Sequence, residues 1–208
     1  MRYFLVAMLA LAGFGAILDR VAVTVGRQVI TENDVIRDVR VAALLDHKPL
    51  DLSGGEKRKA AERLVDQLLI LQEASFSRMP LPAKADMAAA LGPLKADYGS
   101  DYEAALRRYQ ISEDDVVEHL LEGMRAMQYT ELRFKPEVQF SDADLHELYS
   151  RLVEQWKAKG EKEIPDFNSS RDQLEKLLTD QRMAAALDRW LTQQRLETRI
   201  QYRDEVFR

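Results

Sequence analysis

The chain has 208 residues, of which 46% are hydrophobic and 31% are charged, and its formal net charge is −5. That length allows one domain with a sizeable core or two small ones. Acidic and basic residues are interspersed without a basic block, which argues against a nucleic-acid-binding surface. The absence of cysteine excludes disulfides, thiolate metal sites, a lipid-modified cysteine and cysteine nucleophiles.

Residues 1–16 have the layout of a secretory signal peptide. Arg2 precedes an apolar run over 4–12, and small residues such as Gly15 and Ala16 follow it. The run is shorter than the roughly 20 residues of a membrane-spanning helix. We therefore expect export and cleavage, with no stable membrane insertion afterwards. An uncleaved anchor and a buried amino-terminal helix are the alternatives.

Two regions at opposite ends of the chain show the alternation of β-strands. Valines alternate with smaller residues over 21–25, a turn is expected at 26–28, and a return strand begins at 29–30. Apolar and polar residues alternate again over 198–202. Because a lone strand needs a partner, we predict a small sheet that joins the two ends of the chain.

Between these strands, helices are predicted to begin at capping signals, in which Ser or Thr precedes an acidic residue by three positions. The signals are Thr31 with Asp34, Ser53 with Glu56, Ser112 with Asp115, and Ser141 with Asp144, while Ser169 or Ser170 caps the last helix. Helical spacing of apolar residues predicts helices over about 31–46, 53–77, 83–97, 101–109, 112–134, 141–156 and 169–191. Pro93 is expected to kink or break the third of these, and the second is expected at the centre of the core.

The predicted fold is therefore mainly α, with several helices and one small sheet. Residues 17–159 form the first part of one domain, and 169–208 supply a helix and a strand that complete the same domain. We expect the helix around 174–191 to pack on the helix around 64–71. A short polar linker at 160–168 joins the two parts.

The residue patterns of common enzymes and metal sites are incomplete. His146 and Glu147 begin a zinc-protease signature, but Ser150 stands where its second histidine is needed. The three histidines are far apart in sequence, and the chain contains neither a phosphate-binding glycine loop nor a Gly-x-Ser-x-Gly elbow. We predict no enzyme activity, no metal and no cofactor.

Methionines and tyrosines on the middle helices are the candidate binding residues. Thioethers and amphipathic rings adapt to varied peptides without a fixed geometry. Ordinary core packing is the alternative for the same side chains. The candidates for binding an unfolded client are Met87, Tyr98, Tyr102, Tyr109, Met124 and Met127.

The order of these segments resembles the periplasmic chaperone SurA and its relatives. Residues 18–35, LDRVAVTVGRQVITENDV, resemble the hairpin with which those proteins begin. Residues 61–74, 109–115 and 140–145 resemble, in the same order, a helix, a helix entry and the segment that leads into their parvulin-type prolyl isomerase domain. The helix at 184–191 resembles the one that follows that domain and folds back onto the amino-terminal helices.

The resemblance implies a multi-helix chaperone domain of the SurA amino-terminal type that lacks the isomerase, whose place is taken by 160–168. It implies an ATP-independent chaperone in the periplasm that binds unfolded secreted or outer-membrane polypeptides. The alternative is a dedicated interaction subunit that binds one folded cell-envelope partner and has no general holding activity. Whether two copies form a homodimer by exchanging elements stays open.

Overall fold

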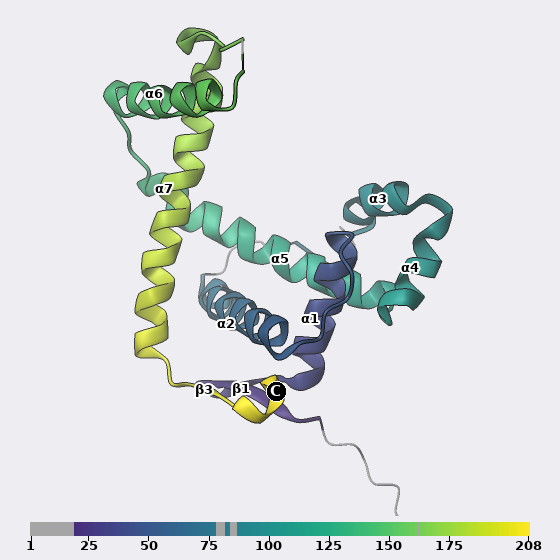
Figure 1. Cartoon of the computed structure of the whole chain (residues 1–208). Helices are drawn as coiled ribbons and strands as arrows, with labels where there is room; N and C mark the ends of the chain where they lie inside the picture. The colour runs from purple at the N-terminus through teal and green to yellow at the C-terminus, as the bar shows by residue number, and fades with distance from the viewer. Residues whose placement is uncertain (1–18, 78–81, 84–86, 162) are drawn as a thin grey trace, which may run out of the picture.

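The computed structural model describes residues 19–77, 82–83, 87–161 and 163–208 (Figure 1). The predicted signal peptide at 1–16 lies outside the described residues. Within them the protein is mainly α-helical with one small antiparallel sheet, which confirms the predicted fold class. The helices are α1 (Glu32–Leu45), α2 (Gly54–Phe76), α3 (Met87–Tyr98), α4 (Tyr102–Tyr109), α5 (Glu113–Phe134), α6 (Asp142–Ala158) and α7 (Phe167–Glu197), and the strands are β1 (Val21–Val25), β2 (Gln28–Thr31) and β3 (Ile200–Tyr202).

The sheet joins the two ends of the described chain, as the alternating segments predict. Its strand order is β2-β1-β3, so the amino-terminal hairpin contributes two neighbours and the carboxyl-terminal strand adds to the far edge of β1. Val25 lies opposite Ile200 in an antiparallel register. At the hairpin turn, Gly26 has a φ of 60°, and its N–H donates to the Arg199 carbonyl at 2.9 Å.

A carboxyl-terminal clasp holds this closure in place. We use that name for Tyr202, Val206 and Phe207 where they lie on the first turns of α2. The Lys57 Nζ donates to the Val206 carbonyl at 2.6 Å, and the Val206 side chain is buried in the core between the sheet, α1 and α2. The Arg58 guanidinium lies 3.8 Å from the centre of the Tyr202 ring, a cation–π geometry.

The apolar core continues from the sheet into the helices. One group of buried residues joins the sheet to α1 and α2, and a second joins α1 to α3, α4 and α5. Helix α2 contributes to the first group and, near its carboxyl end, to a third group shared with α5 and α7. This agrees with its predicted central position. In Figure 1, α5 runs from α7 across to the corner formed by α3 and α4.

The two halves of the long helix α7 pack against different helices. Its carboxyl-terminal half follows the prediction, because Leu187, Trp190 and Leu191 pack against Ile70 of α2 and Tyr129 of α5. Its amino-terminal half does not reach α2. There Leu174 and Leu178 form a separate apolar group with α6, which is the part of the prediction that is wrong.

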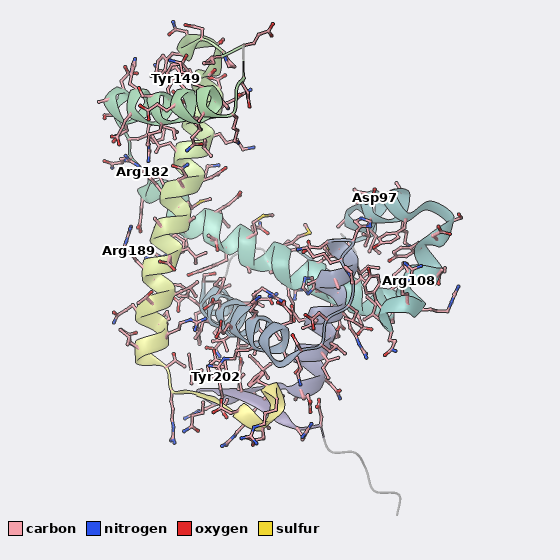
Figure 2. The ribbon with its side chains drawn as sticks, in the orientation of Figure 1. Asp97, Arg108, Tyr149, Arg182, Arg189 and Tyr202 are labelled. Atoms are coloured by element: carbon pink, nitrogen blue, oxygen red, sulfur yellow. The ribbon has the colours of Figure 1, made fainter. Side chains whose placement is uncertain are left out.

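Helix α6 and the amino-terminal half of α7 thus form an arm that stands away from the sheet (Figure 1). Polar contacts hold the arm together: the Tyr149 hydroxyl donates to the Pro165 carbonyl at 2.8 Å, and Arg182 of α7 pairs with Asp144 of α6 at 2.8 Å. Figure 2 shows Tyr149 on α6 and Arg182 lower on α7, at opposite ends of this arm.

The helix starts largely follow the sequence. Thr31, Ser112 and Ser141 each form a complete capping box with the aspartate three residues on. Ser53 accepts only the forward hydrogen bond, from the Glu56 N–H. Each cap satisfies N–H groups that the first turn leaves without helical partners.

The start of α7 differs from the prediction. The Asp166 carboxylate caps it by accepting from the N–H groups of Asn168 and Ser169, so the helix begins at Phe167 and Ser170 is buried within it. Aspartate both caps the free N–H groups and complements the helix dipole. The helix therefore begins inside the predicted linker.

Pro93 does not break α3, which continues through it to Tyr98. Proline removes one helical hydrogen bond and crowds the preceding turn. Met87 and Leu91 are nevertheless buried against the α1, α4 and α5 core, and Leu94 packs beside them. This apolar face holds the helix together across the proline.

The first turn of α2 offers a matched test of the clasp. A Cβ at Gly54 would lie 1.8 Å from the Phe207 carbonyl oxygen, whereas a Cβ at Gly55 would meet no atom within 4 Å. We expect Gly54→Ala to displace the clasp and lower the free energy of unfolding by about 1–3 kcal/mol. Gly55→Ala should be neutral or stabilise by up to about 1 kcal/mol. Urea denaturation followed by circular dichroism measures both, and equal stability of the two variants would contradict the described packing.

Candidate functional site

A large groove lies between α1, α2, α5 and α7 and has a volume of about 980 Å³. Side chains from all four helices form its apolar lining. They include Ala42 and Ala43 of α1, Ile70 of α2, Ala126 of α5, and Leu187 and Leu191 of α7. The groove therefore combines an apolar lining with charged side chains, among them Asp38, Arg63 and His119.

Small residues create this groove. Ala42 and Ala43 on α1 and Gly123 and Ala126 on α5 line its walls. A Cβ at Gly123 would meet no atom within 4 Å, so the helix backbone itself borders the open space. Larger side chains at these positions would fill the channel, since the interior of a protein otherwise packs closely.

Ion pairs surround the apolar lining. Lys48 pairs with Asp46 at 2.8 Å and Lys59 pairs with Glu56 at 2.7 Å. Hydrogen bonding to Lys48, reinforced by its charge, lowers the pKa of Asp46. The rim is therefore charged on both sides, with most charges compensated locally.

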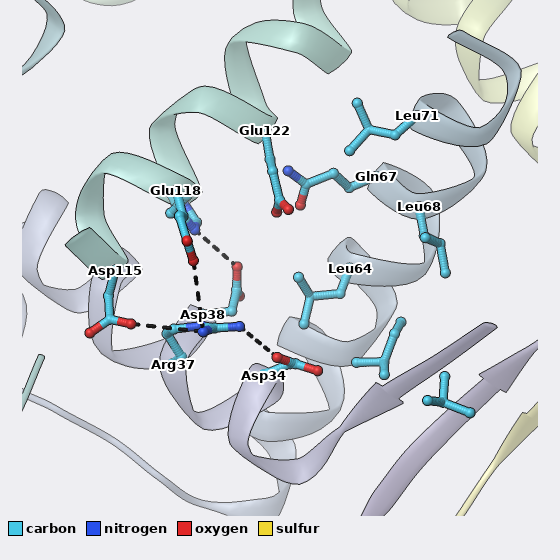
Figure 3. A pocket seen from close by; sticks show the side chains of 13 residues that line it. Asp34, Arg37, Asp38, Leu64, Gln67, Leu68, Leu71, Asp115, Glu118 and Glu122 are labelled. Carbon is cyan, nitrogen blue, oxygen red and sulfur yellow. Dashed lines mark hydrogen bonds and ion pairs between the residues drawn. The ribbon is translucent and has the colours of Figure 1, made fainter. Parts of the chain in front are cut away.

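A small groove lies on the other side of the α1–α2–α5 junction, beside β2 (Figure 3), with a volume of about 220 Å³. One wall comes from β2 and α2 and is mostly apolar, with Gln67 as its polar member: Val29, Ile30, Leu64, Gln67, Leu68 and Leu71. The other wall is polar and comes from α1 and α5: Asp34, Arg37, Asp38, Asp115, Glu118, His119 and Glu122.

A buried ionic cluster separates the two grooves. The Asp38 carboxylate is only 5% exposed, and it accepts from Arg63 of α2 at 2.6 Å and lies 3.4 Å from the His119 Nδ1 of α5. Asp38 and His119 line both grooves. The cluster thus connects three helices through one carboxylate.

A carboxylate beside a histidine can orient a general base, and here the same carboxylate also pairs with Arg63 of α2. Arg63 already neutralises Asp38. Among the described residues that line either groove, none carries a hydroxyl or thiol that His119 could activate. In the part of the chain that the structure describes, no group of His, Cys, Asp and Glu has the geometry of a metal site.

The six predicted binding residues do not form one exposed surface. Met87, Tyr102 and Tyr109 are buried in the core between α1, α3, α4 and α5, and they cannot contact a client in this conformation. Burial raises the pKa of Tyr102 to about 12, so its ring stays uncharged. The core-packing alternative is the correct one for these three residues.

The other three predicted residues have mixed positions. Tyr98 and Met124 are half-buried against the same core, and the Tyr98 hydroxyl donates to the Leu44 carbonyl at 2.7 Å. Met127 is 60% exposed on α5. None of the six lines the large groove. Only Met127 keeps the accessibility that a binding role needs.

The large groove is lined by small residues whose spacing is visible in the sequence but does not by itself predict a binding site. Paired alanines at Ala42 and Ala43, and the Gly123 and Ala126 pair three residues apart, suit close helix packing as well as an open channel. Which of these the residues form depends on where α7 lies, and this is a property of the tertiary structure.

Comparison with known proteins does not extend the sequence interpretation. Neither the models of known protein families nor the curated proteins give a match to this chain. The resemblance to the SurA family stays a prediction from the residues quoted above. In the described ranges, no helix combines the length and hydropathy that crossing a bilayer requires.

The ionic cluster predicts a pH dependence of stability. Burial holds the pKa of His119 below its usual value, with Arg63 acting in the same direction and Asp38 opposing it. The unfolded chain therefore takes up this proton at higher pH than the folded protein does, and acidification below about pH 6.5 destabilises the fold.

His119→Gln removes this titration while keeping a side chain of polar character. We expect the variant to lose less unfolding free energy than the wild type between about pH 7 and pH 5. Urea titrations at several pH values measure the two slopes. Identical slopes would show that His119 does not contribute to the acid sensitivity.

Proposed function

We propose that this protein is an ATP-independent periplasmic chaperone that holds unfolded secreted or outer-membrane polypeptides in the large groove. The observation that supports the proposal is an open channel of about 980 Å³ with an apolar lining and a charged rim. That volume lies near the upper end of ligand pockets, which range over roughly 300–1,000 Å³. It suits several side chains of a polypeptide better than one small metabolite.

The chemistry of the groove favours low sequence specificity. Contacts with its alanine, leucine and isoleucine side chains depend on apolar area and set no fixed geometry. The ion pairs of the rim keep the surrounding surface soluble and satisfy one another without a ligand. A binder of this kind should hold many unfolded chains weakly, with dissociation constants of roughly micromolar size, or about −8 kcal/mol.

Apolar side chains elsewhere on the surface would extend such contacts. Phe76 at the end of α2 is 81% exposed, and Met127 and Leu132 on α5 are also exposed. Single exposed apolar side chains are common on protein surfaces and mark a binding site only where they form a continuous patch. These three are secondary contacts in the proposal, and the groove is the primary one.

Gly123 allows the groove to be tested without disturbing the core. Gly123→Glu places a carboxylate over the apolar lining, where a bound apolar segment would strip it of water. Such desolvation costs about 1–3 kcal/mol in proteins, so client affinity should fall by about tenfold or more. Gly92→Glu is the matched control, because Gly92 is an exposed helical glycine outside the groove whose Cβ also meets nothing within 4 Å.

The readout is suppression of aggregation of several unrelated unfolded proteins without ATP, with circular dichroism to check that both variants fold. We expect wild type and Gly92→Glu to be active and Gly123→Glu to be weakened. Equal activity of the two variants would remove the groove from the site. A wild-type protein that suppresses no aggregation, but binds one folded envelope protein, would favour the dedicated-subunit alternative.

The periplasmic part of the proposal rests on residues 1–16 and has a separate test. Cell fractionation and amino-terminal sequencing of the native protein should give a periplasmic chain that begins near Ala16 to Asp19. Recovery of an intact Met1 from the cytoplasmic fraction would contradict it.

A further inference from the structure

The polar wall of the small groove carries negative charge that the described residues do not compensate. Asp34 and Asp115 are used as capping-box partners of α1 and α5. Arg37 is the arginine of this wall, and it is shared between Asp34 at 2.5 Å, Asp115 at 3.8 Å and Glu118 at 4.0 Å. Asp38 is neutralised by Arg63 of α2, which lines the large groove.

Glu122 has no such partner, because no described residue forms a hydrogen bond or ion pair with its carboxylate. Partial burial raises its pKa, and the charges of Glu118 and Asp34 add to the effect while Arg37 and Arg125 oppose it. Figure 3 shows the Glu118 carboxylate pointing toward Arg37, and Glu122 reaching from α5 into the groove toward Gln67 of α2, which lies between Leu64 and Leu71. The groove thus presents Glu122 without an ion-pair partner among the described residues, one helical turn from Glu118, which shares Arg37 with two aspartates.

The wall opposite α5, formed by α2 and β2, is mostly apolar. Leu64, Leu68 and Leu71 project from α2, and Val29, which is 52% exposed, lies at the outer edge of the sheet. A ligand for this groove therefore needs an apolar portion against the leucines and a positive charge at the glutamates. Lysine and arginine side chains have this composition, because an aliphatic stem carries the charged group.

We propose that the small groove binds a lysine or arginine side chain carried by an extended polypeptide segment. The stem lies along Leu68 and Leu71, and the ammonium or guanidinium group pairs with Glu122 and Glu118. The volume of about 220 Å³ corresponds to about seven waters of about 30 Å³ each, which suits one long side chain and its neighbour.

The sheet edge supports the extended form of the ligand. β2 is the outer strand of the sheet, with β1 as its neighbour among the described residues, and its Val29 and Ile30 line the groove. A segment that runs along an open strand edge directs alternate side chains to one side. One of these would enter the groove while the backbone stays at its mouth.

The proposal does not rest on general chaperone activity, because a dedicated partner could present the same side chain. In this proposal the small groove selects basic side chains, whereas the large groove binds apolar segments without selecting their sequence. The two sites are separated by the Asp38 cluster and can be inactivated independently.

The test uses an acetylated and amidated peptide, Leu-Thr-Lys-Thr-Leu, and a second peptide with norleucine in place of lysine. Norleucine keeps the aliphatic stem and lacks the charge. Titration calorimetry with the full mature chain should show the lysine peptide binding about tenfold more tightly, since a partly desolvated charge pair separates the two. Equal affinity for the two peptides would overturn the proposal, as would no measurable binding of either.

Variants of α5 locate the site. Glu122→Gln should weaken binding of the lysine peptide by about tenfold and leave the norleucine peptide nearly unchanged. Glu131→Gln is the control, because Glu131 is exposed on the same helix outside the groove and its substitution changes the net charge equally. If both variants weaken binding to the same extent, the attraction is only that of a cation for an acidic protein, and the proposal is wrong.

Two further variants test the apolar wall and the independence of the grooves. Leu71 lines the groove without belonging to a buried core group, so Leu71→Ala should weaken both peptides several-fold while the fold is retained. Gly123→Glu should leave binding of the uncharged norleucine peptide unchanged even where client holding is lost. Loss of norleucine-peptide binding in this variant would show that the small groove is not the separate site described.

Discussion

The pairing of β3 with the edge of β1 is the contact on which the rest of the protein depends. It brings the end of α7 to the sheet, and the clasp then fixes the last residues on α2 through Lys57 and Val206. With its carboxyl end held there, α7 lies against both α2 and α5. The large groove exists because α7 is held in this position and supplies Leu187 and Leu191 as its fourth wall.

The Asp38 ionic cluster lies between the two grooves and lines both of them, and the side chains on its two sides differ in chemistry. Asp38, Arg63 and His119 fill the junction between α1, α2 and α5 with charges that compensate one another. On one side, alanine and leucine side chains provide apolar area with little directional preference. On the other, glutamates of α5 line the same groove as Gln67 and the leucines of α2, so that side offers both charge and apolar surface. In the two proposals, one domain would thus combine a broad contact with a selective contact.

Local features of the fold could be predicted from the sequence, and features that depend on distant packing could not. The capping boxes at Thr31, Ser112 and Ser141 and the alternation at 198–202 are set by neighbouring residues, and they are correct. The start of α7 was missed because Asp166 competes with the serines as a cap. The candidate binding residues could not be sorted into buried and exposed ones from the sequence, because a methionine or tyrosine on an apolar helix face looks the same in both cases. Met87 and Met127 differ only in whether another helix covers them.

The joining of distant segments in one sheet also bears on how the chain folds. β1 and β3 are separated by about 180 residues, and closing a flexible loop of that length costs on the order of 5 kcal/mol of entropy. The hairpin and the contacts of α1 with α2 close much shorter loops, so they form first and the terminal pairing forms late. Contacts made last are commonly the ones that open most readily in the native state. Release of β3 would leave α7 held only by its packing on α2 and α5, so the position of one wall of the large groove is tied in part to the local stability of three strand residues.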